Sequence, residues 1–223
     1  MTHELKTPVA SISLASQMLN DPAVTKSPKM LEHISNIIKD ETKRLTFQVD
    51  KVLQMSVFER ENIKMELQEN NINEIIQTIA ENYSLKIHSK GGNLYTDLQA
   101  HNAFVNIDEM HFGNIIYNLL DNAVKYSRGD TPIIITISTW NDNKDNLFIS
   151  IEDNGIGIKK EYIKHIFDKF YRVPTGNRHD IKGFGLGLSY VKKIIQLHKG
   201  QIKVESEPNI GTKFIIELKT IEI

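Results

Sequence analysis

Residues 114–126 combine an apolar helix face with a regular row of amides, and they read Asn114-Ile115-Ile116-Tyr117-Asn118-Leu119-Leu120-Asp121-Asn122-Ala123-Val124-Lys125-Tyr126. Asn114, Asn118 and Asn122 recur every four residues and therefore lie on one face of a helix predicted over residues 110–126. Asparagine is a poor helix former, so the stability cost of three asparagines on one helix face indicates that they have a functional role. Their amide oxygens suit Mg²⁺, and Lys125 can reach a phosphate group. A polar stripe on a surface helix explains the same pattern equally well.

Two glycine-rich motifs follow this helix along the chain. The first, Asp153-Asn154-Gly155-Ile156-Gly157-Ile158, comes directly after a predicted strand. Asp153 can accept a hydrogen bond from an exocyclic amine, and the glycines let a flat ring approach the backbone. An ordinary Asp-Asn-Gly turn is the alternative reading of this motif.

The second glycine motif, Gly183-Phe184-Gly185-Leu186-Gly187-Leu188, precedes a predicted helix. Backbone N–H groups exposed at a helix N-terminus suit phosphate oxygens. The motif lacks both the βαβ context of a dinucleotide fold and the lysine of a P-loop. Upstream, the aromatic side chains of residues 166–173 are expected to form a hinge, and Arg172 can stabilise charge on a transferring phosphoryl group. The polar segment 174–182 is predicted to be a mobile lid.

A fourth motif, His3-Glu4-Leu5-Lys6-Thr7-Pro8, stands at the head of the chain. A neutral imidazole is a competent nucleophile toward phosphorus, and the carboxylate of Glu4 can accept its proton. Pro8 is expected to bend the helix just beyond His3. A solvated helix end with no catalytic role is the alternative for a His-Glu pair taken alone.

Hydrophobic periodicity divides the chain into a helical part, residues 1–63, and a mixed part, residues 64–223. In the first, a helix ends near Asn20, and a second helix from Pro28 to about Arg60 carries apolar residues at seven-residue intervals. Two such helices cannot bury their apolar faces alone, so we expect a homodimeric four-helix bundle. The mixed part is predicted to be α+β, with helices over 73–87, 110–126 and 186–198 and strands over 94–98, 133–140, 147–152, 201–206 and 213–219.

Composition narrows the class of protein. The 223 residues include 27 Lys and Arg against 28 Asp and Glu, and no basic stripe is present, so we expect no nucleic-acid partner. Without cysteine, disulfides and thiolate metal sites are excluded. No apolar run is long enough to span a membrane. Because the chain opens only two residues before His3, we expect it to be part of a longer protein whose first helix begins further upstream.

Taken in order, these motifs resemble the H, N, G1, F and G2 boxes of the sensor histidine kinases, and Gly211-Thr212 resembles the G3 element. The resemblance covers nearly the whole chain. It implies a dimerisation and phosphoacceptor hairpin followed by a two-layer α/β sandwich of the Bergerat type that binds ATP and Mg²⁺. The implied reaction is autophosphorylation on histidine and phosphotransfer to an aspartate of a response regulator receiver domain.

The resemblance also implies roles for individual residues. His3 matches the phosphoacceptor, Glu4 the residue that assists it, and Thr7 a position linked to dephosphorylation of the receiver; with Arg172 they form the expected catalytic set. Asn122 matches the Mg²⁺ ligand. The expected nucleotide-binding set is Asn118, Asn122, Lys125, Tyr126, Asp153, Gly155, Gly157, Ile158, Gly183, Gly185, Leu186, Gly187, Leu188 and Thr212.

Two other functions account for part of the sequence. An ATPase of the wider Bergerat group explains the Asn, Asp and Gly motifs but leaves His3-Glu4 at the head of a hairpin without a purpose. A catalytically silent dimerisation scaffold would be expected to have lost Asn122, Asp153 or the glycines, and all are present. The kinase reading places this chain in the cytoplasm, as part of a sensor whose membrane anchor lies in segments absent from it.

Overall fold

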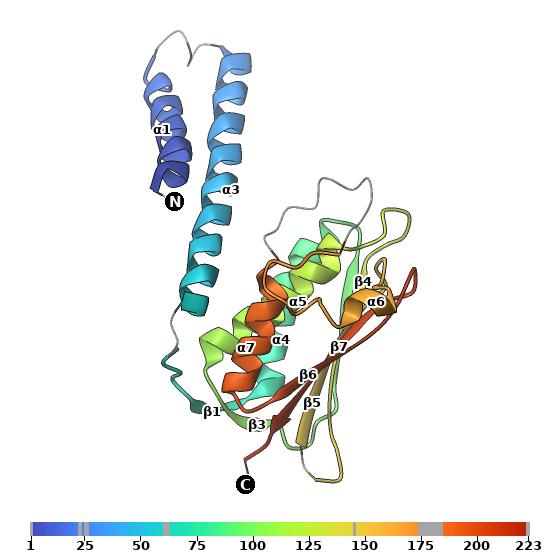
Figure 1. The fold of residues 1–223 in the computed structure, drawn as a ribbon. Helices are drawn as coiled ribbons and strands as arrows, with labels where there is room; N and C mark the ends of the chain where they lie inside the picture. The colour runs from blue at the N-terminus through green and yellow to red at the C-terminus, as the bar shows by residue number, and fades with distance from the viewer. Residues whose placement is uncertain are drawn as a thin grey trace. The chain divides into compact units, whose positions relative to one another are not determined.

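The computed structural model describes residues 2–21, 24, 27–59, 63–144, 146–173 and 185–221 (Figure 1). The chain divides into two compact units, Met1–Glu61 and Asn62–Ile223. We describe each by itself. Among the helices described, none combines the length and the apolar character that crossing a bilayer requires.

The first unit is a hairpin of two helices, α1 (Thr2–Met18) and α3 (Pro28–Glu59). Helix α1 continues through Pro8 to Met18. The core of the hairpin consists of three buried residues, Ala15, Val24 and Ile34. The partly buried residues packed against them are Leu19, Leu31, Ile37 and Ile38. Val9 and Leu14 remain 51% and 62% exposed. A second hairpin would cover such side chains, and the four-helix bundle stays a prediction.

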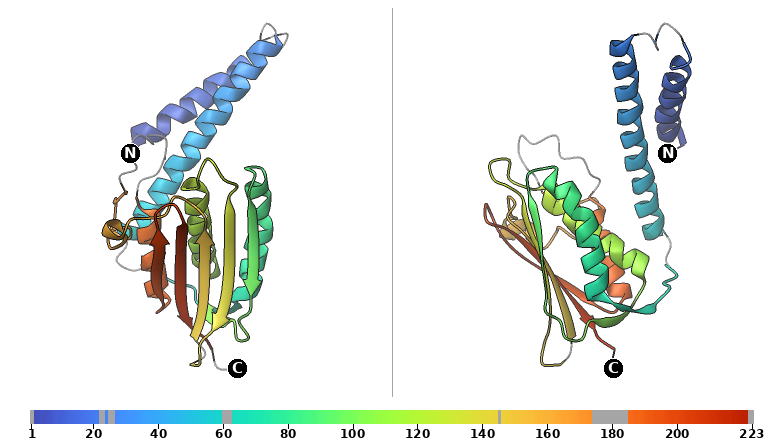
Figure 2. Two further views of the ribbon diagram at one scale, coloured as in Figure 1. Left: turned by 90° about the vertical axis from the view of Figure 1, so that its right-hand side faces the viewer. Right: turned by 180° about the vertical axis from the view of Figure 1, so that it is seen from behind.

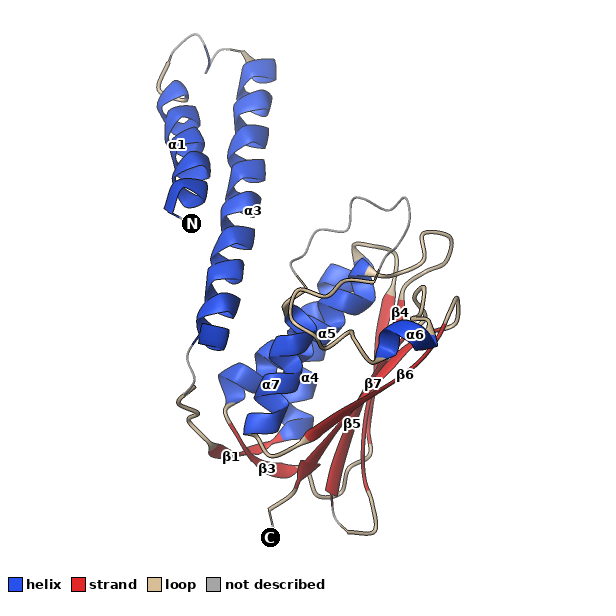
Figure 3. Ribbon diagram, viewed as in Figure 1, coloured by secondary structure: helices blue, strands red, loops and turns tan. Residues whose placement is uncertain are grey.

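The second unit is a two-layer α+β sandwich, which confirms the predicted fold class (Figure 2). Its five-stranded sheet has the order β2-β4-β5-β7-β6, in which only the β2–β4 pair is parallel. The strands are β2 (Asn93–Leu98), β4 (Ile134–Asn141), β5 (Asn146–Asp153), β6 (Gln201–Glu207) and β7 (Gly211–Lys219). Helices α4 (Ile72–His88), α5 (Glu109–Lys125) and α7 (Gly187–Leu197) cover one face of this sheet (Figure 3).

Along the strands of this sheet, apolar side chains point toward the helices at alternate positions. Ile135 and Ile137 on β4, like Ile149 and Ile151 on β5, are buried, whereas Thr136 between the first pair is half-exposed. Successive side chains of a strand point to opposite faces, so the isoleucines line the layer beneath the helices. On the helix side, α5 buries seven apolar residues on one face, as its periodicity predicts.

Three short elements were not expected from the sequence: β1 (Gln68–Asn71), β3 (Phe104–Ile107) and the single turn α6 (Lys160–Ile163). Strands β1 and β3 pair antiparallel in a separate two-stranded sheet. They lie immediately before α4 and α5. Each helix begins at a side-chain cap, where Asn71 accepts a hydrogen bond from the Asn73 N–H and Asp108 accepts one from the His111 N–H, both at 3.0 Å.

Because each unit has its own core, a cavity in one should leave the other intact. Ile34 and Ile76 are 1% and 0% exposed, in the hairpin and in α4 respectively. We expect Ile34→Ala to destabilise the hairpin, and Ile76→Ala the second unit, each by about 2–5 kcal/mol. Hydrogen exchange measured by mass spectrometry checks this. Loss of amide protection in both units from either substitution would contradict the division.

Candidate functional site

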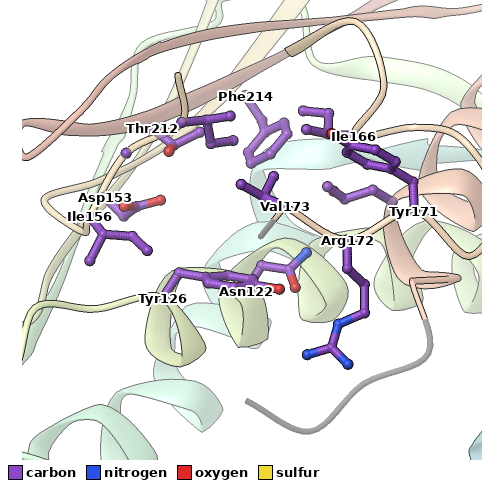
Figure 4. A pocket seen from close by; sticks show the side chains of 13 residues that line it. Asn122, Tyr126, Asp153, Ile156, Ile166, Tyr171, Arg172, Val173, Thr212 and Phe214 are labelled. Carbon is purple, nitrogen blue, oxygen red and sulfur yellow. The ribbon is translucent and has the colours of Figure 1, made fainter. Parts of the chain in front are cut away.

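The candidate site is a pocket of the second unit, between the C-terminal end of α5 and the neighbouring ends of β5 and β7 (Figure 4). Its lining joins segments distant in the sequence: the end of α5, the turn after β5, residues 166–173, the start of α7, and β7. The lining residues are Asn122, Tyr126, Asp153, Ile156, Gly157, Ile158, Ile166, Tyr171, Arg172, Val173, Leu188, Thr212 and Phe214.

Asp153 is the acidic residue of this pocket, and it stands at the last position of β5 opposite Thr212 of β7. Its Oδ1 accepts a hydrogen bond from the Gly155 N–H at 2.8 Å, and the Thr212 N–H also donates to the carboxylate. Burial raises the pKa of Asp153 to about 6, against the lowering effect of these two donors. The site therefore holds a partly desolvated acceptor.

Main-chain contacts hold the turn that follows Asp153. The Ile156 N–H donates to the Tyr126 carbonyl at 3.0 Å, and the Ile158 N–H donates to the Ser206 hydroxyl at 2.8 Å. Gly157 has φ +66°, and a Cβ there would lie 2.0 Å from the Glu207 carbonyl oxygen. Only glycine fits this position, because both the backbone conformation and the space exclude a side chain.

Ser206 is a contributor to this site that the sequence analysis missed. Its hydroxyl donates to the Gly211 carbonyl at 2.7 Å, accepts from the Ile158 N–H, and lies 2.9 Å from the Thr212 hydroxyl. It thereby connects the turn after β5 to the start of β7. A lone serine in a strand carries no motif, so only the fold reveals this role.

Positive charge gathers on the α5 side of the pocket. The Lys125 ammonium group lies 5.1 Å from the centroid of the Tyr126 ring. Burial lowers the pKa of Lys125, and repulsion from the nearby Arg172 lowers it further. Arg172 itself lines the pocket. Lys125 and Arg172 therefore offer two cations to an anionic ligand.

The amides on α5 fit a magnesium ion that a phosphate ligand brings with it. Asn122 lines the pocket, and Asn118 donates from Nδ2 to the Asn114 carbonyl at 2.7 Å, which leaves its Oδ1 as an acceptor. Within the described ranges, no group of three acidic or histidine side chains could hold a metal ion alone. Mg²⁺ is commonly held by few protein ligands together with water and phosphate oxygens.

The structure brings only part of the predicted site together. Gly155 lies in the turn beside Asp153, and Asn118 and Gly187 lie side by side, since a Cβ on Gly187 would meet the Asn118 Oδ1 at 2.8 Å. Gly185 lies against the Tyr171 carbonyl. The Leu186 side chain is 1% exposed and belongs to the core, whereas Leu188 lines the pocket.

Other predicted residues are not placed in the pocket. Gly183 and the predicted lid, residues 174–182, fall outside the described residues. His3 and Glu4 belong to helix α1 of the hairpin, but their side chains are likewise not described; Thr7 is exposed on the same helix. The pocket adds apolar residues that the sequence analysis did not single out, including Ile166, Val173 and Phe214.

Comparison with known proteins assigns both units to families. Residues 107–222 match the family described as "Histidine kinase-, DNA gyrase B-, and HSP90-like ATPase", and residues 1–61 match the "His Kinase A (phospho-acceptor) domain". The chain belongs to the first family, whose match covers more than half of it. The combination of the two domains identifies it, within that family, as a sensor histidine kinase.

Curated sensor proteins are similar to this chain over nearly its whole length. Sensor protein RprX of Bacteroides fragilis (strain YCH46) is 56% identical over 222 residues, which is 100% of this chain and 43% of the relative. Sensor histidine kinase YclK of Bacillus subtilis (strain 168) is 30% identical over 220 residues, covering 98% of this chain and 45% of that protein. The chain thus spans less than half the length of these curated relatives.

Solved structures of histidine kinases share the fold. Full-length ShkA in complex with AMPPNP superposes with a TM-score of 0.78 at 21% identity, over 99% of this chain and 45% of that one. Histidine kinase ThkA in complex with the response regulator protein TrrA gives a TM-score of 0.64 at 25% identity, over 99% and 60%.

We expect Gly157→Ala to destabilise the second unit, because the new Cβ meets a backbone carbonyl and the residue needs φ +66°. The cost should be about 1–3 kcal/mol, the usual size for a strained backbone position. Urea unfolding followed by circular dichroism measures it. Gly129→Ala is the matched control, since a Cβ at Gly129 meets nothing within 4 Å. Equal stability of the two variants would contradict the packing described for Gly157.

Proposed function

We propose that this chain is the catalytic core of an ATP-dependent protein-histidine kinase that phosphorylates His3. The observation that carries the proposal is the presence, in one chain, of a phosphoacceptor-type hairpin and of a pocket that is lined by the partly buried carboxylate of Asp153 and by Arg172. A Bergerat-type ATPase without kinase activity would not require a phosphoacceptor hairpin. The alternative functions therefore explain less of the chain.

Asp153 is proposed to recognise adenine. A carboxylate that already accepts two backbone N–H groups has capacity for one more donor, and the exocyclic amine of adenine supplies it. Tyr126, Ile156 and Phe214 provide apolar walls on which the ring can lie. Gly155, Gly157, Ile158 and Thr212 would shape the floor of the same pocket.

The phosphate groups are proposed to extend along α5 toward Lys125 and Arg172. These cations would neutralise charge on the phosphates, and Asn122, with Asn118 nearby, would hold the Mg²⁺ that accompanies ATP. Bound Mg²⁺ supplies further neutralisation of the β and γ oxygens. Gly183, Gly185, Leu186, Gly187 and Leu188 complete the proposed nucleotide-binding set.

His3 is the proposed nucleophile. Its imidazole nitrogen forms a bond to the γ-phosphorus while the bond to the bridging oxygen breaks and ADP leaves. Glu4 accepts or orients the proton on the imidazole ring, and Arg172 stabilises negative charge on the phosphoryl group during its transfer. Thr7 would serve dephosphorylation of the partner, as its position in the motif implies.

The proposed acceptor of the phosphoryl group is an aspartate of a response regulator receiver domain. ThkA, whose solved complex contains the response regulator protein TrrA, supports this partner class. We further propose that the hairpin, residues 1–63, forms a homodimer, with residues 64–223 as the catalytic domain. In the cell this chain would be the cytoplasmic part of a sensor whose membrane anchor lies outside it.

Transfer of label from γ-labelled ATP in the presence of Mg²⁺ tests the proposal. We expect acid-labile label on the parent chain and none on His3→Gln, because the amide cannot attack phosphorus. His33→Gln, which replaces an exposed histidine on the second helix of the same hairpin, should keep the label. ADP affinity should agree within about twofold among the three proteins, since the pocket is unchanged. Label that persists on His3→Gln would rule out His3 as the acceptor.

Nucleotide affinity should fall as the pH is lowered through about 6, the pKa of Asp153 without nucleotide. The ionised carboxylate accepts the adenine amine, so binding to the protonated form requires release of a proton. Below that pKa the ADP dissociation constant should rise by up to about tenfold per pH unit. Isothermal titration between pH 5 and pH 8 measures this.

Two variants accompany that titration. Asp153→Asn should bind ADP weakly with little pH dependence, whereas Glu69→Gln, at an exposed position of β1 outside the pocket lining, should keep the pH profile of the parent. A parent affinity that is constant from pH 8 to pH 5 would overturn the role of Asp153.

A further inference from the structure

Helices α5 and α7 run side by side in opposite directions and are joined by a row of polar contacts, which we call the α5–α7 seam. His198, which follows α7, contacts Asp108, which precedes α5. Tyr190 of α7 contacts His111 and Asn114 of α5. Gly187, the first residue of α7, lies against Asn118. The seam therefore runs from the far end of the two helices to the edge of the nucleotide pocket.

His198 anchors the far end of this seam. Its Nε2 lies 2.9 Å from the Asp108 backbone nitrogen, and its Nδ1 lies 2.9 Å from the Ile194 carbonyl oxygen. A backbone N–H can only donate and a carbonyl can only accept, so the ring must carry its proton on Nδ1. His198 is 7% exposed, and burial lowers its pKa, which favours this neutral form.

Asp108 makes the anchor rigid on the α5 side. Its carboxylate caps the helix through the His111 N–H and also accepts from the Glu66 N–H, both at 3.0 Å. It is 6% exposed, and burial alone would raise the pKa of its carboxyl group, but the two backbone donors and the neighbouring histidines together lower that pKa below its usual value. The hydrogen bond from its own N–H to His198 thus joins the end of α7 to the capped N-terminus of α5.

The opposite end of the seam lies at the proposed phosphate side of the pocket. Asn118 is ten residues, or about 15 Å, along the chain from Asp108. There the two helices approach so closely that a Cβ on Gly187 would be 2.8 Å from the Asn118 Oδ1. Leu188 of α7 and Asn122 of α5 both line the pocket. A shift of α7 along α5 would change the spacing of all four residues.

We propose that His198 is a positioning residue for the phosphate groups of the nucleotide: it fixes α7 along α5 and so sets the spacing between Gly187-Leu188 and Asn118-Asn122. This inference rests on the nucleotide binding proposed above. The adenine side of the pocket depends on Asp153 and Thr212, which lie on strands outside the seam. Disturbing His198 should consequently weaken binding of phosphates more than binding of adenosine.

Two substitutions of His198 separate positioning from general stability. The side chain of His198→Gln is long enough to accept from the Asp108 N–H, as Nε2 does. The shorter side chain of His198→Asn can replace only the contact that Nδ1 makes with the Ile194 carbonyl. We expect His198→Asn to weaken binding of AMPPNP with Mg²⁺ by about fivefold or more and binding of adenosine by less than about twofold, with His198→Gln close to the parent in both.

Calorimetric or NMR titration of the full chain with each ligand provides the measurement. Ile195→Val, a buried substitution on α7 outside the seam, controls for lost stability and should affect both ligands equally. If His198→Asn does not fold, Tyr190→Phe tests the same seam, with an expected loss of about twofold to threefold for AMPPNP alone.

The outcomes separate the two proposals. Selective loss of AMPPNP affinity in His198→Asn, with recovery in His198→Gln, supports the positioning role. Equal losses for both ligands, equal behaviour of the Asn and Gln variants, or no loss at all would overturn it. A parent chain that binds neither ligand would instead defeat the proposed nucleotide binding itself.

Discussion

The register between β5 and β7 is the constraint on which the pocket depends. It places Asp153 opposite Thr212, so that the carboxylate receives backbone donors from its own turn and from the neighbouring strand. A slip of one residue would turn every side chain of the strand to the other face. Asp153 would then leave the pocket, and Ile149 and Ile151 would leave the core. Core packing and ligand recognition are therefore secured by the same pairing.

The partly buried carboxylate of Asp153 illustrates a stability cost accepted at the candidate site. Burial raises the pKa of Asp153 to about 6, so ionisation of this carboxyl group is less favourable in the folded protein than in the unfolded chain. A raised carboxyl pKa means that the folded state binds more protons than the unfolded state between the two pKa values. Its contribution to stability is thus lost as the pH rises through about 6, which is the opposite of the usual salt-bridged aspartate.

The larger elements could be predicted from the sequence because their periodicity is strong. Helix α5 places its apolar residues on one face over 17 residues, and its observed bounds differ from the predicted ones by one residue at each end. Strands β4 and β5 were also predicted, over residues 133–140 and 147–152, within one residue of their observed bounds. Strand β1 could not be found in this way, because Gln68–Asn71 contains four polar residues and its existence depends on pairing with β3.

The candidate site was predictable where a residue type carries its own chemistry. Asp153, Asn122 and Lys125 stand out by charge, spacing or motif, and the fold brings all three near one end of α5. Ser206 and Phe214 do not stand out, since their contribution depends on tertiary contacts alone. The same holds for His198, whose two ring nitrogens gain their roles only from the neighbouring helix ends.

Main-chain contacts hold the turn that contributes Ile156, Gly157 and Ile158 to the floor of the pocket. The Ile156 N–H donates to the Tyr126 carbonyl at 3.0 Å, the Asn209 N–H donates to the Ile156 carbonyl at 2.8 Å, and Gly157 lies directly on the Glu207 carbonyl. Point mutations change side chains far more readily than they move such backbone. An inhibitor designed against this floor would leave few routes to drug resistance, and those routes would lie in the side-chain walls formed by Ile166, Val173 and Phe214.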